Sequence, residues 1–194
     1  MKRCSMKCIL PLLLLLVSIP ALSQLPDSII RRVVIVRHGE KPKNGDNLSC
    51  EGLNRALALP DVLDSLFGKP DYSYVPRIHT GKSTSNVRMF QTISPMAVRY
   101  NLTVDTKYKE TDTVNVAAEI LTKKGTILIV WEHGNIPGVA RNLGVTKPDL
   151  HWDGSDFDSI WVIDFVNRNG KWVPTFKKKK EHINPSDKCP EVKK

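Results

Sequence analysis

The sequence lacks several features that would assign it to common structural or functional classes. It contains no internal repeat and no low-complexity linker that would divide it into separate domains. No two histidines stand four residues apart and no paired Cys/His spacing occurs, so we expect no metal site. Gly81-Lys82-Ser83 resembles the end of a phosphate-binding P-loop, but Pro76 replaces the glycine that such a loop requires.

Long apolar runs are missing too, apart from Ile9 to Val17. This run follows a short basic segment and precedes small residues, which is the pattern of a secretory signal peptide. It is shorter than the roughly 20 apolar residues that a membrane-spanning helix needs. We therefore expect residues 1–23 to be a cleaved leader. The mature chain, residues 24–194, would then be secreted or periplasmic and not stably inserted in a membrane.

Acidic residues are outnumbered, with 20 Asp and Glu against 29 Lys and Arg. The leader carries three cations and no acids, so its removal lowers the formal net charge from +9 to +6. A lysine run, Lys177 to Lys180, predicts a solvated basic tail over about 177–194 rather than a nucleic-acid surface.

Outside the leader the sequence has two cysteines, Cys50 and Cys189. They could pair in an oxidising compartment or be two unrelated thiols.

From residue 32 onward, short β-branched runs alternate with helical patterns. The expected strands are 32–37, 75–80 and 126–131, followed by a C-terminal antiparallel hairpin of 159–166 and 171–176. The expected helices are 50–67 capped by Ser49, one capped by Ser83, Thr84 or Ser85 and running toward Tyr100, 113–123, and a short one from Asn135 to Gly144. This order predicts a single three-layer α/β/α sandwich with a mostly parallel central sheet.

Two histidines follow strands of this predicted sheet. His38 comes directly after the strand 32–37, and His133 comes two residues after the strand 126–131. Ligands of open α/β sheets bind beyond the carboxyl ends of the strands. We therefore expect the two histidines to share a site.

The residues around His38 suit phosphoryl transfer. The planar guanidinium of Arg37 can bind two phosphate oxygens at once. A neutral imidazole can attack phosphorus when a hydrogen bond holds its other nitrogen protonated. Gly39 allows the backbone to approach an anion closely, and the helix after His133 would offer further N–H donors. Such a pocket requires neither a metal nor a cofactor.

Four segments together resemble the histidine phosphatase superfamily, the phosphoglycerate-mutase-like proteins (branch 1). They are Val36-Arg37-His38-Gly39-Glu40, Leu48 to Ala56, Val87 to Thr92, and Glu132-His133-Gly134-Asn135, in the order that the family has. The resemblance implies that His38 takes the phosphoryl group as a phosphohistidine. It also implies that Arg37, Arg88 and His133 bind the phosphate. Glu40 and Lys41 would line the entrance.

The proton donor to the leaving group is less clearly marked. Some twenty residues after Arg88, the resemblance points to Glu110 as the acid, with Asp112 as its rival, and some relatives have no separate acid. The remaining histidines, His79, His151 and His182, are assigned to structural roles. Three of the four tryptophans, Trp131, Trp152 and Trp161, could line a cleft, but we expect them in the core.

The sequence thus predicts an exported, metal-independent phosphatase of small phosphomonoesters, of the histidine acid phosphatase type. One alternative is a non-catalytic phosphate-binding protein of the cell envelope. A second is a phosphomutase that uses the same pocket.

Overall fold

The computed structural model describes residues 29–191, so the expected leader and its cleavage point lie outside the described part of the chain. Six strands form one sheet in the order β5-β2-β6-β1-β7-β8. Their bounds are β1 Ile29–Arg37, β2 Tyr72–Tyr74, β5 Val104–Asp105, β6 Gly125–Trp131, β7 Ser159–Arg168 and β8 Lys171–Lys180. The first four strands of this order are parallel, and β7 and β8 form the antiparallel hairpin. The predicted sheet architecture is confirmed.

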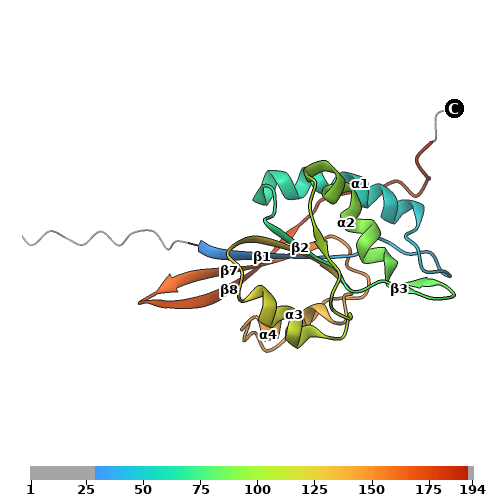
Figure 1. Cartoon of the computed structure of the whole chain (residues 1–194). Helices are drawn as coiled ribbons and strands as arrows, with labels where there is room; N and C mark the ends of the chain where they lie inside the picture. The colour runs from blue at the N-terminus through green and yellow to red at the C-terminus, as the bar shows by residue number, and fades with distance from the viewer. Residues whose placement is uncertain (1–28, 192–194) are drawn as a thin grey trace, which may run out of the picture.

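Two pairs of helices cover the two faces of the sheet (Figure 1). One face carries α1 (Cys50–Phe67) and α2 (Val87–Tyr100), and the other carries α3 (Thr113–Ile120) and α4 (Ile136–Asn142). Each pair packs over its own apolar cluster. Since β1 and β6 are buried from both sides, their near-continuous apolar sequence is what this position requires.

The three tryptophans expected in the core are buried. Trp131 and Trp161 are fully buried and Trp152 is 2% exposed. The rings of Trp152 and Trp161 lie 5.0 Å apart, and Phe176 packs edge-on against Trp161 at 5.1 Å. Together they fill the α3–α4 side of the sheet beneath β7 and β8.

The strand predicted over 75–80 is wrong in its position. The sheet strand is β2, which ends at Tyr74, while His79–Thr80 form β3 of a separate two-stranded ribbon with β4 (Thr84–Ser85). Pro76 accounts for the early end, because proline has no N–H to donate to a ladder.

The predicted caps of the second helix are also wrong. Thr84 and Ser85 belong to β4, and α2 begins at Val87 after Asn86, which has a left-handed backbone and makes no side-chain cap. Strand pairing in the ribbon uses the residues that would otherwise cap the helix.

The third helix is shorter than expected, since α3 ends at Ile120 and is followed by a turn.

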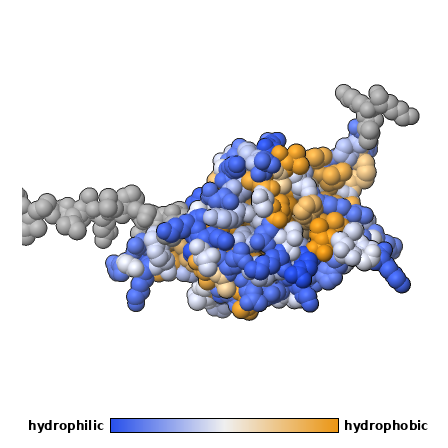
Figure 2. Space-filling view, viewed as in Figure 1, coloured by the Kyte–Doolittle hydropathy of each residue, from blue (hydrophilic) through white to orange (hydrophobic). Residues whose placement is uncertain are grey.

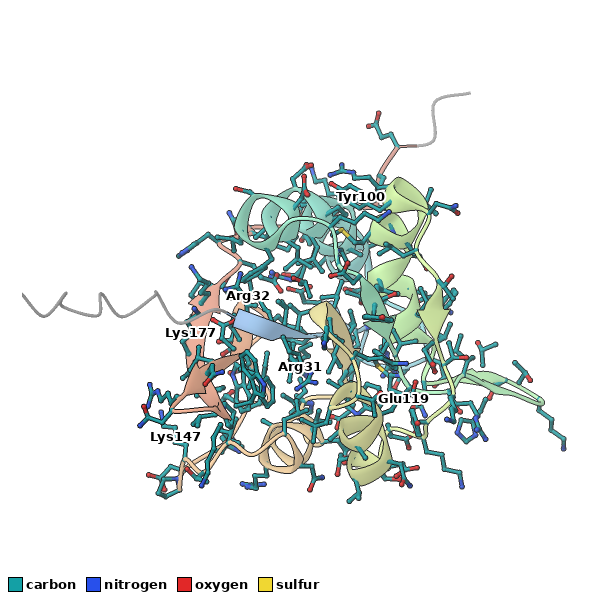
Figure 3. The ribbon with its side chains drawn as sticks, turned by 60° about the vertical axis from the view of Figure 1, so that its left-hand side comes forward. Arg31, Arg32, Tyr100, Glu119, Lys147 and Lys177 are labelled. Carbon is teal, nitrogen blue, oxygen red and sulfur yellow. A yellow bond between two sulfur atoms is a disulfide. The ribbon has the colours of Figure 1, made fainter. Side chains whose placement is uncertain are left out.

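The basic tail predicted over 177–194 does not begin at Lys177. Lys177 to Lys180 continue β8 and pair in register with Ser159 to Val162 of β7. Lys177 Nζ lies 2.7 Å from Asp164, a carboxylate that Arg32 also binds at 2.6 Å. Figure 3 shows Arg32 and Lys177 on the same side of the molecule. Lys178 lies over the ring of Trp161 at 5.0 Å. These contacts hold the lysines in the sheet.

The β7–β8 turn confirms the predicted tight hairpin. Arg168 pairs with Lys171, so the loop consists of Asn169 and Gly170, and both have positive φ (53° and 80°). This is the geometry that an Asn-Gly turn favours.

Within residues 29–191, no helix combines the length and the apolar character that crossing a membrane would demand.

Candidate active site

His38 stands at the carboxyl end of β1, where its backbone N–H donates to the Trp131 carbonyl of β6 at 3.3 Å. The side chain is 3% exposed. Its Nδ1 lies 2.7 Å from the carbonyl oxygen of Gly39. A carbonyl can only accept, so this contact places the proton on Nδ1 and leaves the lone pair on Nε2.

The surroundings keep the His38 ring neutral. The pKa of His38 is lowered to about 4, mainly by burial and also by the positive charges of Arg37 and Arg88, against the opposing effects of the Gly39 hydrogen bond and Glu132. Above that pH the ring is an uncharged imidazole with a fixed tautomer. It therefore has the protonation state that a nitrogen nucleophile needs.

Arg37 is buried beside His38, with 3% of its surface exposed. Its Nη1 donates to the carbonyl oxygens of Gly154 at 2.6 Å and Asp156 at 3.3 Å. The guanidinium stacks on Phe157 at 3.8 Å, and the same ring meets His38 edge-on. Its buried Nε has no hydrogen-bond partner among residues 29–191. An unpaired buried donor on a cation is suited to an anionic ligand.

Gly39 is packed directly against the start of α1. A Cβ on Gly39 would lie 2.7 Å from the Gly52 carbonyl oxygen, so only glycine fits there without displacing backbone. The Gly39 N–H donates to Thr92 Oγ1 at 2.9 Å, and that hydroxyl donates to the Arg88 carbonyl. The loop after His38 is thus held by both α1 and α2.

Arg88 lies on the first turn of α2 and is partly exposed. Its Nη2 donates to the Gly45 carbonyl at 2.6 Å and its Nε to the Asn47 carbonyl at 3.2 Å. It therefore fastens the loop between β1 and α1, and its charge is close enough to His38 to lower that pKa.

His133 also faces this site. Its Nδ1 lies 2.6 Å from Glu132 Oε1 without hydrogen-bond alignment, so Nδ1 has no hydrogen bond and the contact is an ion pair only when His133 is protonated. Burial and the charge of Arg37 lower the pKa of His133, although Glu132 opposes them. A Cβ on Gly154 would lie 3.4 Å from His133 Nε2, so this nitrogen and Arg37 approach the same glycine.

The start of α4 is less available to a ligand than predicted. The Asn135 N–H donates to the Glu132 carboxylate at 3.2 Å, and the Ile136 N–H donates to the Glu132 carbonyl. Glu132 thus occupies N–H groups that were expected to face phosphate.

The two candidate acids differ in their surroundings. Glu110 is half-buried, its Oε2 accepts from Asn86 Nδ2 at 2.6 Å, and its backbone carbonyl accepts from Trp131 Nε1 at 2.8 Å. Asn86 stands two residues before Arg88, and Trp131 pairs with Arg37 across the sheet. Asp112 instead caps α3 through Asn115. Glu110 is therefore the better placed of the two.

Glu40 does not line the entrance as expected. It is 9% exposed and binds Arg55 of α1 through both carboxylate oxygens. Lys41 is exposed, and its charge lowers the pKa of His133.

Sequence reasoning missed Arg55, Thr92 and Phe157. Arg55 and Thr92 lie in segments that carry the family resemblance, and Thr92 also stands one helical turn after Arg88, whereas Phe157 lies outside these segments.

Two large surface cavities lie elsewhere. One of about 790 Å³ borders β2 and β5, and one of about 830 Å³ lies between α1 and α2 beside Cys50 and Cys189. Figure 2 shows apolar side chains gathered over this second region. Neither cavity is lined by His38, Arg37 or His133, which stand at or just beyond the ends of β1 and β6. The described residues contain no group of three or more His, Cys, Asp or Glu that could hold a metal ion.

Comparison with solved structures identifies phosphatases of the same fold. A comparison with protein-family models finds no match, and neither does one with curated protein sequences. The structure of SixA from Agrobacterium tumefaciens, assigned as a phosphohistidine phosphatase, superposes with a TM-score of 0.52 at 18% identity over 77% of this chain and 99% of that one. A mycobacterial glucosyl-3-phosphoglycerate phosphatase, solved with inorganic phosphate, superposes with a TM-score of 0.55 at 15% identity over 79% of this chain and all of its own. The chain therefore has the fold of these two phosphatases.

Proposed function

We propose that the protein is a metal-independent phosphomonoesterase of the histidine phosphatase superfamily and that His38 is its nucleophile. The observation that carries the proposal is the pairing of two features. His38 is a buried neutral imidazole with its proton held on Nδ1, and beside it Arg37 has a buried Nε with no partner in the described chain. One supplies a lone pair, and the other an N–H donor for phosphate oxygens.

The first step is attack of His38 Nε2 on phosphorus. The N–P bond forms as the P–O bond to the leaving group breaks, and the leaving oxygen takes a proton. Arg37 and Arg88 neutralise the charge on the phosphoryl oxygens during transfer. His133 contributes a further donor, because a bound phosphate dianion would favour its protonated form. Water then attacks phosphorus, the N–P bond breaks, and inorganic phosphate leaves with His38 neutral again.

Glu110 is our candidate for the leaving-group acid. Asn86 fixes the direction of its carboxylate, and the backbone contact with Trp131 fixes its distance from the end of β6. The proton would come from this carboxyl and return from the water that hydrolyses the phosphohistidine.

We further propose that the protein acts in an exported, oxidising setting on small phosphorylated substrates. The leader-like sequence of residues 1–23 and the Cys50–Cys189 disulfide support this setting. The two structural neighbours act, by their descriptions, on phosphohistidine and on glucosyl-3-phosphoglycerate, and both substrates are candidates here.

Hydrolysis of an aryl phosphate by the wild type and by His38→Ala tests the proposal. We expect the variant to lose turnover, and acid-labile phosphate to label the wild type but not the variant. A matched control is His79→Ala, an exposed histidine of β3, which should keep full activity. Binding of phosphate without turnover would favour the non-catalytic alternative, and conversion of a phosphoglycerate to its isomer without release of phosphate would favour the mutase.

A further inference from the structure

A buried cluster of charges lies behind the candidate nucleophile. Arg55, 5% exposed, donates through Nε and Nη2 to the Glu40 carboxylate at 2.7 to 3.0 Å. Its Nη1 donates to Glu181 Oε2 at 2.7 Å, and Glu181 is 4% exposed. Arg55 thus joins the loop after His38 to the residue that follows β8.

Stability alone does not explain this cluster. Moving charges out of water is costly, and a buried ion pair is often no more stabilising than apolar side chains of the same volume. Here two carboxylates share one guanidinium, with Asp158 nearby adding more negative charge. Such an arrangement fixes geometry better than it adds stability.

The geometry that it fixes includes the ring of His38. Glu40 follows Gly39, whose carbonyl accepts from His38 Nδ1. The Glu40 carbonyl accepts from the Ser49 N–H at 2.9 Å, and its backbone touches Gly52 so closely that a Cβ there would lie 2.2 Å from the oxygen. A displacement of Glu40 would therefore turn the Gly39 carbonyl and with it the imidazole.

The C-terminal segment 181–189 is fastened to the same helix at further points. Asn54 Nδ2 donates to the carbonyls of Ser186 and Lys188 at 2.8 and 2.7 Å. Cys189 forms a disulfide with Cys50, the first residue of α1. The Glu181 N–H also donates to the Asp158 carbonyl at 2.8 Å. The segment is thus held at several points against the start of α1 and, at its first residue, also to Asp158.

We propose that Arg55 and Glu181 are positioning residues for His38, and that segment 181–189 acts as a strap that holds the nucleophile loop in place. The strap acts through α1 and Glu40, and it touches neither the reacting atoms nor the phosphate donors. Its kinetic consequences rest on the proposed function. Loss of the strap should therefore slow phosphoryl transfer and leave substrate binding largely intact.

The kinetic test compares three single variants of the full mature chain. Glu181→Ala removes the contact with Arg55, Glu181→Gln keeps an oxygen acceptor, and Asp187→Asn removes an exposed carboxylate from the same segment. We expect Glu181→Ala to lower kcat about tenfold to hundredfold with KM changed less than about twofold, since misplacement by about 1 Å has effects of that size. Glu181→Gln should recover kcat to within about threefold of the wild type, and Asp187→Asn should match it. Wild-type kcat in folded Glu181→Ala, a loss confined to KM, or equal losses in all three variants would overturn the proposal.

Reduction of the disulfide provides a test without substitution. In folded wild type, reduction of Cys50–Cys189 should lower kcat and leave KM nearly unchanged. An unchanged kcat after complete reduction would contradict the role of the strap.

A second readout does not depend on turnover. NMR of ¹⁵N-labelled histidine reports which ring nitrogen carries the proton, and the signal missing from His38→Ala identifies His38. We expect a single Nδ1–H tautomer in the wild type and exchange between tautomers in Glu181→Ala. If the wild type hydrolyses no phosphomonoester, the proposed function fails, and the NMR comparison still decides the positioning role. An unaltered tautomer in Glu181→Ala would refute it.

Discussion

Replacing Gly52 by alanine would test how closely α1 must approach the loop that carries His38. A Cβ at this position would lie 2.2 Å from the Glu40 carbonyl oxygen and 2.7 Å from the Glu40 nitrogen. Ordinary contact begins at 3.4 Å, so helix and loop would have to separate by about 1.2 Å at the oxygen, the difference between 3.4 and 2.2 Å. Both atoms belong to backbone, so no side chain can rotate away to relieve the clash.

Two effects of Gly52→Ala can be measured separately. Overpacking of this kind typically costs about 1–3 kcal/mol, which lowers the Tm of a domain of this size by roughly 2–12 °C. A shift of about 1 Å at the nucleophile should reduce kcat about 100-fold. Thermal unfolding followed by circular dichroism gives the first effect, and steady-state hydrolysis of an aryl phosphate gives the second.

Gly81→Ala is the matched control for this substitution. A Cβ on Gly81 would meet no atom within 4 Å, so its Tm and kcat should stay close to those of the wild type. If Gly52→Ala had the Tm and the kcat of the wild type, the close packing of helix and loop would not matter for either property. That result would refute the reasoning.

Four further predictions follow from individual contacts. Burial lowers the pKa of His38 to about 4, so the acid limb of the kcat/KM profile should lie near pH 4, with a fall of about tenfold per pH unit below it. An acid limb near pH 6.5 in the pH–rate profile would contradict the burial of the ring. Burial raises the pKa of Glu181 from 4.5 to about 7, so the contribution of this group to stability should be fully present below pH 4.5 and decline as pH rises through about 7, by about 3 kcal/mol. Chemical denaturation of Glu181→Gln should lack that decline, and a parallel pH dependence in the variant would count against it. Thr92→Val leaves the Gly39 N–H without its acceptor, which should cost about 1–3 kcal/mol in urea unfolding, whereas Ser94→Ala, an exposed hydroxyl on the same helix, should cost much less. Reduction of Cys50–Cys189, which closes a separation of 139 residues, should lower the unfolding free energy by up to about 5 kcal/mol, and an identical Tm with and without reductant would disprove a stabilising disulfide.

The sheet could be predicted from sequence because its central strands have no polar face. The near-continuous apolar runs of β1 and β6 fit burial on both sides, and their neighbouring positions bring the ends of both strands to one edge. His38 and His133 follow the neighbouring ends of these two strands for that reason. Proximity of this kind follows from topology and needs no knowledge of side-chain packing.

The features that sequence did not predict depend on partners far along the chain. The partners of Arg55 stand 15 and 126 residues away, and nothing in its helix marks it as buried. The lysine run predicts a solvated tail, because nothing near it in sequence shows that Asp164 and the ring of Trp161, both from β7, contact Lys177 and Lys178. Pro76 was visible, but its effect was to shift the strand toward Tyr72 rather than to remove it.

The position of β8 at the margin of the sheet has a consequence for solubility. An edge strand of ten residues exposes unpaired backbone N–H and C=O groups, to which a strand of another molecule can add. The four consecutive lysines place positive charge along the C-terminal end of β8. A second copy that approached with its own β8 edge would therefore be repelled. The lysine run therefore protects the protein against edge-to-edge aggregation while it pairs inward with β7.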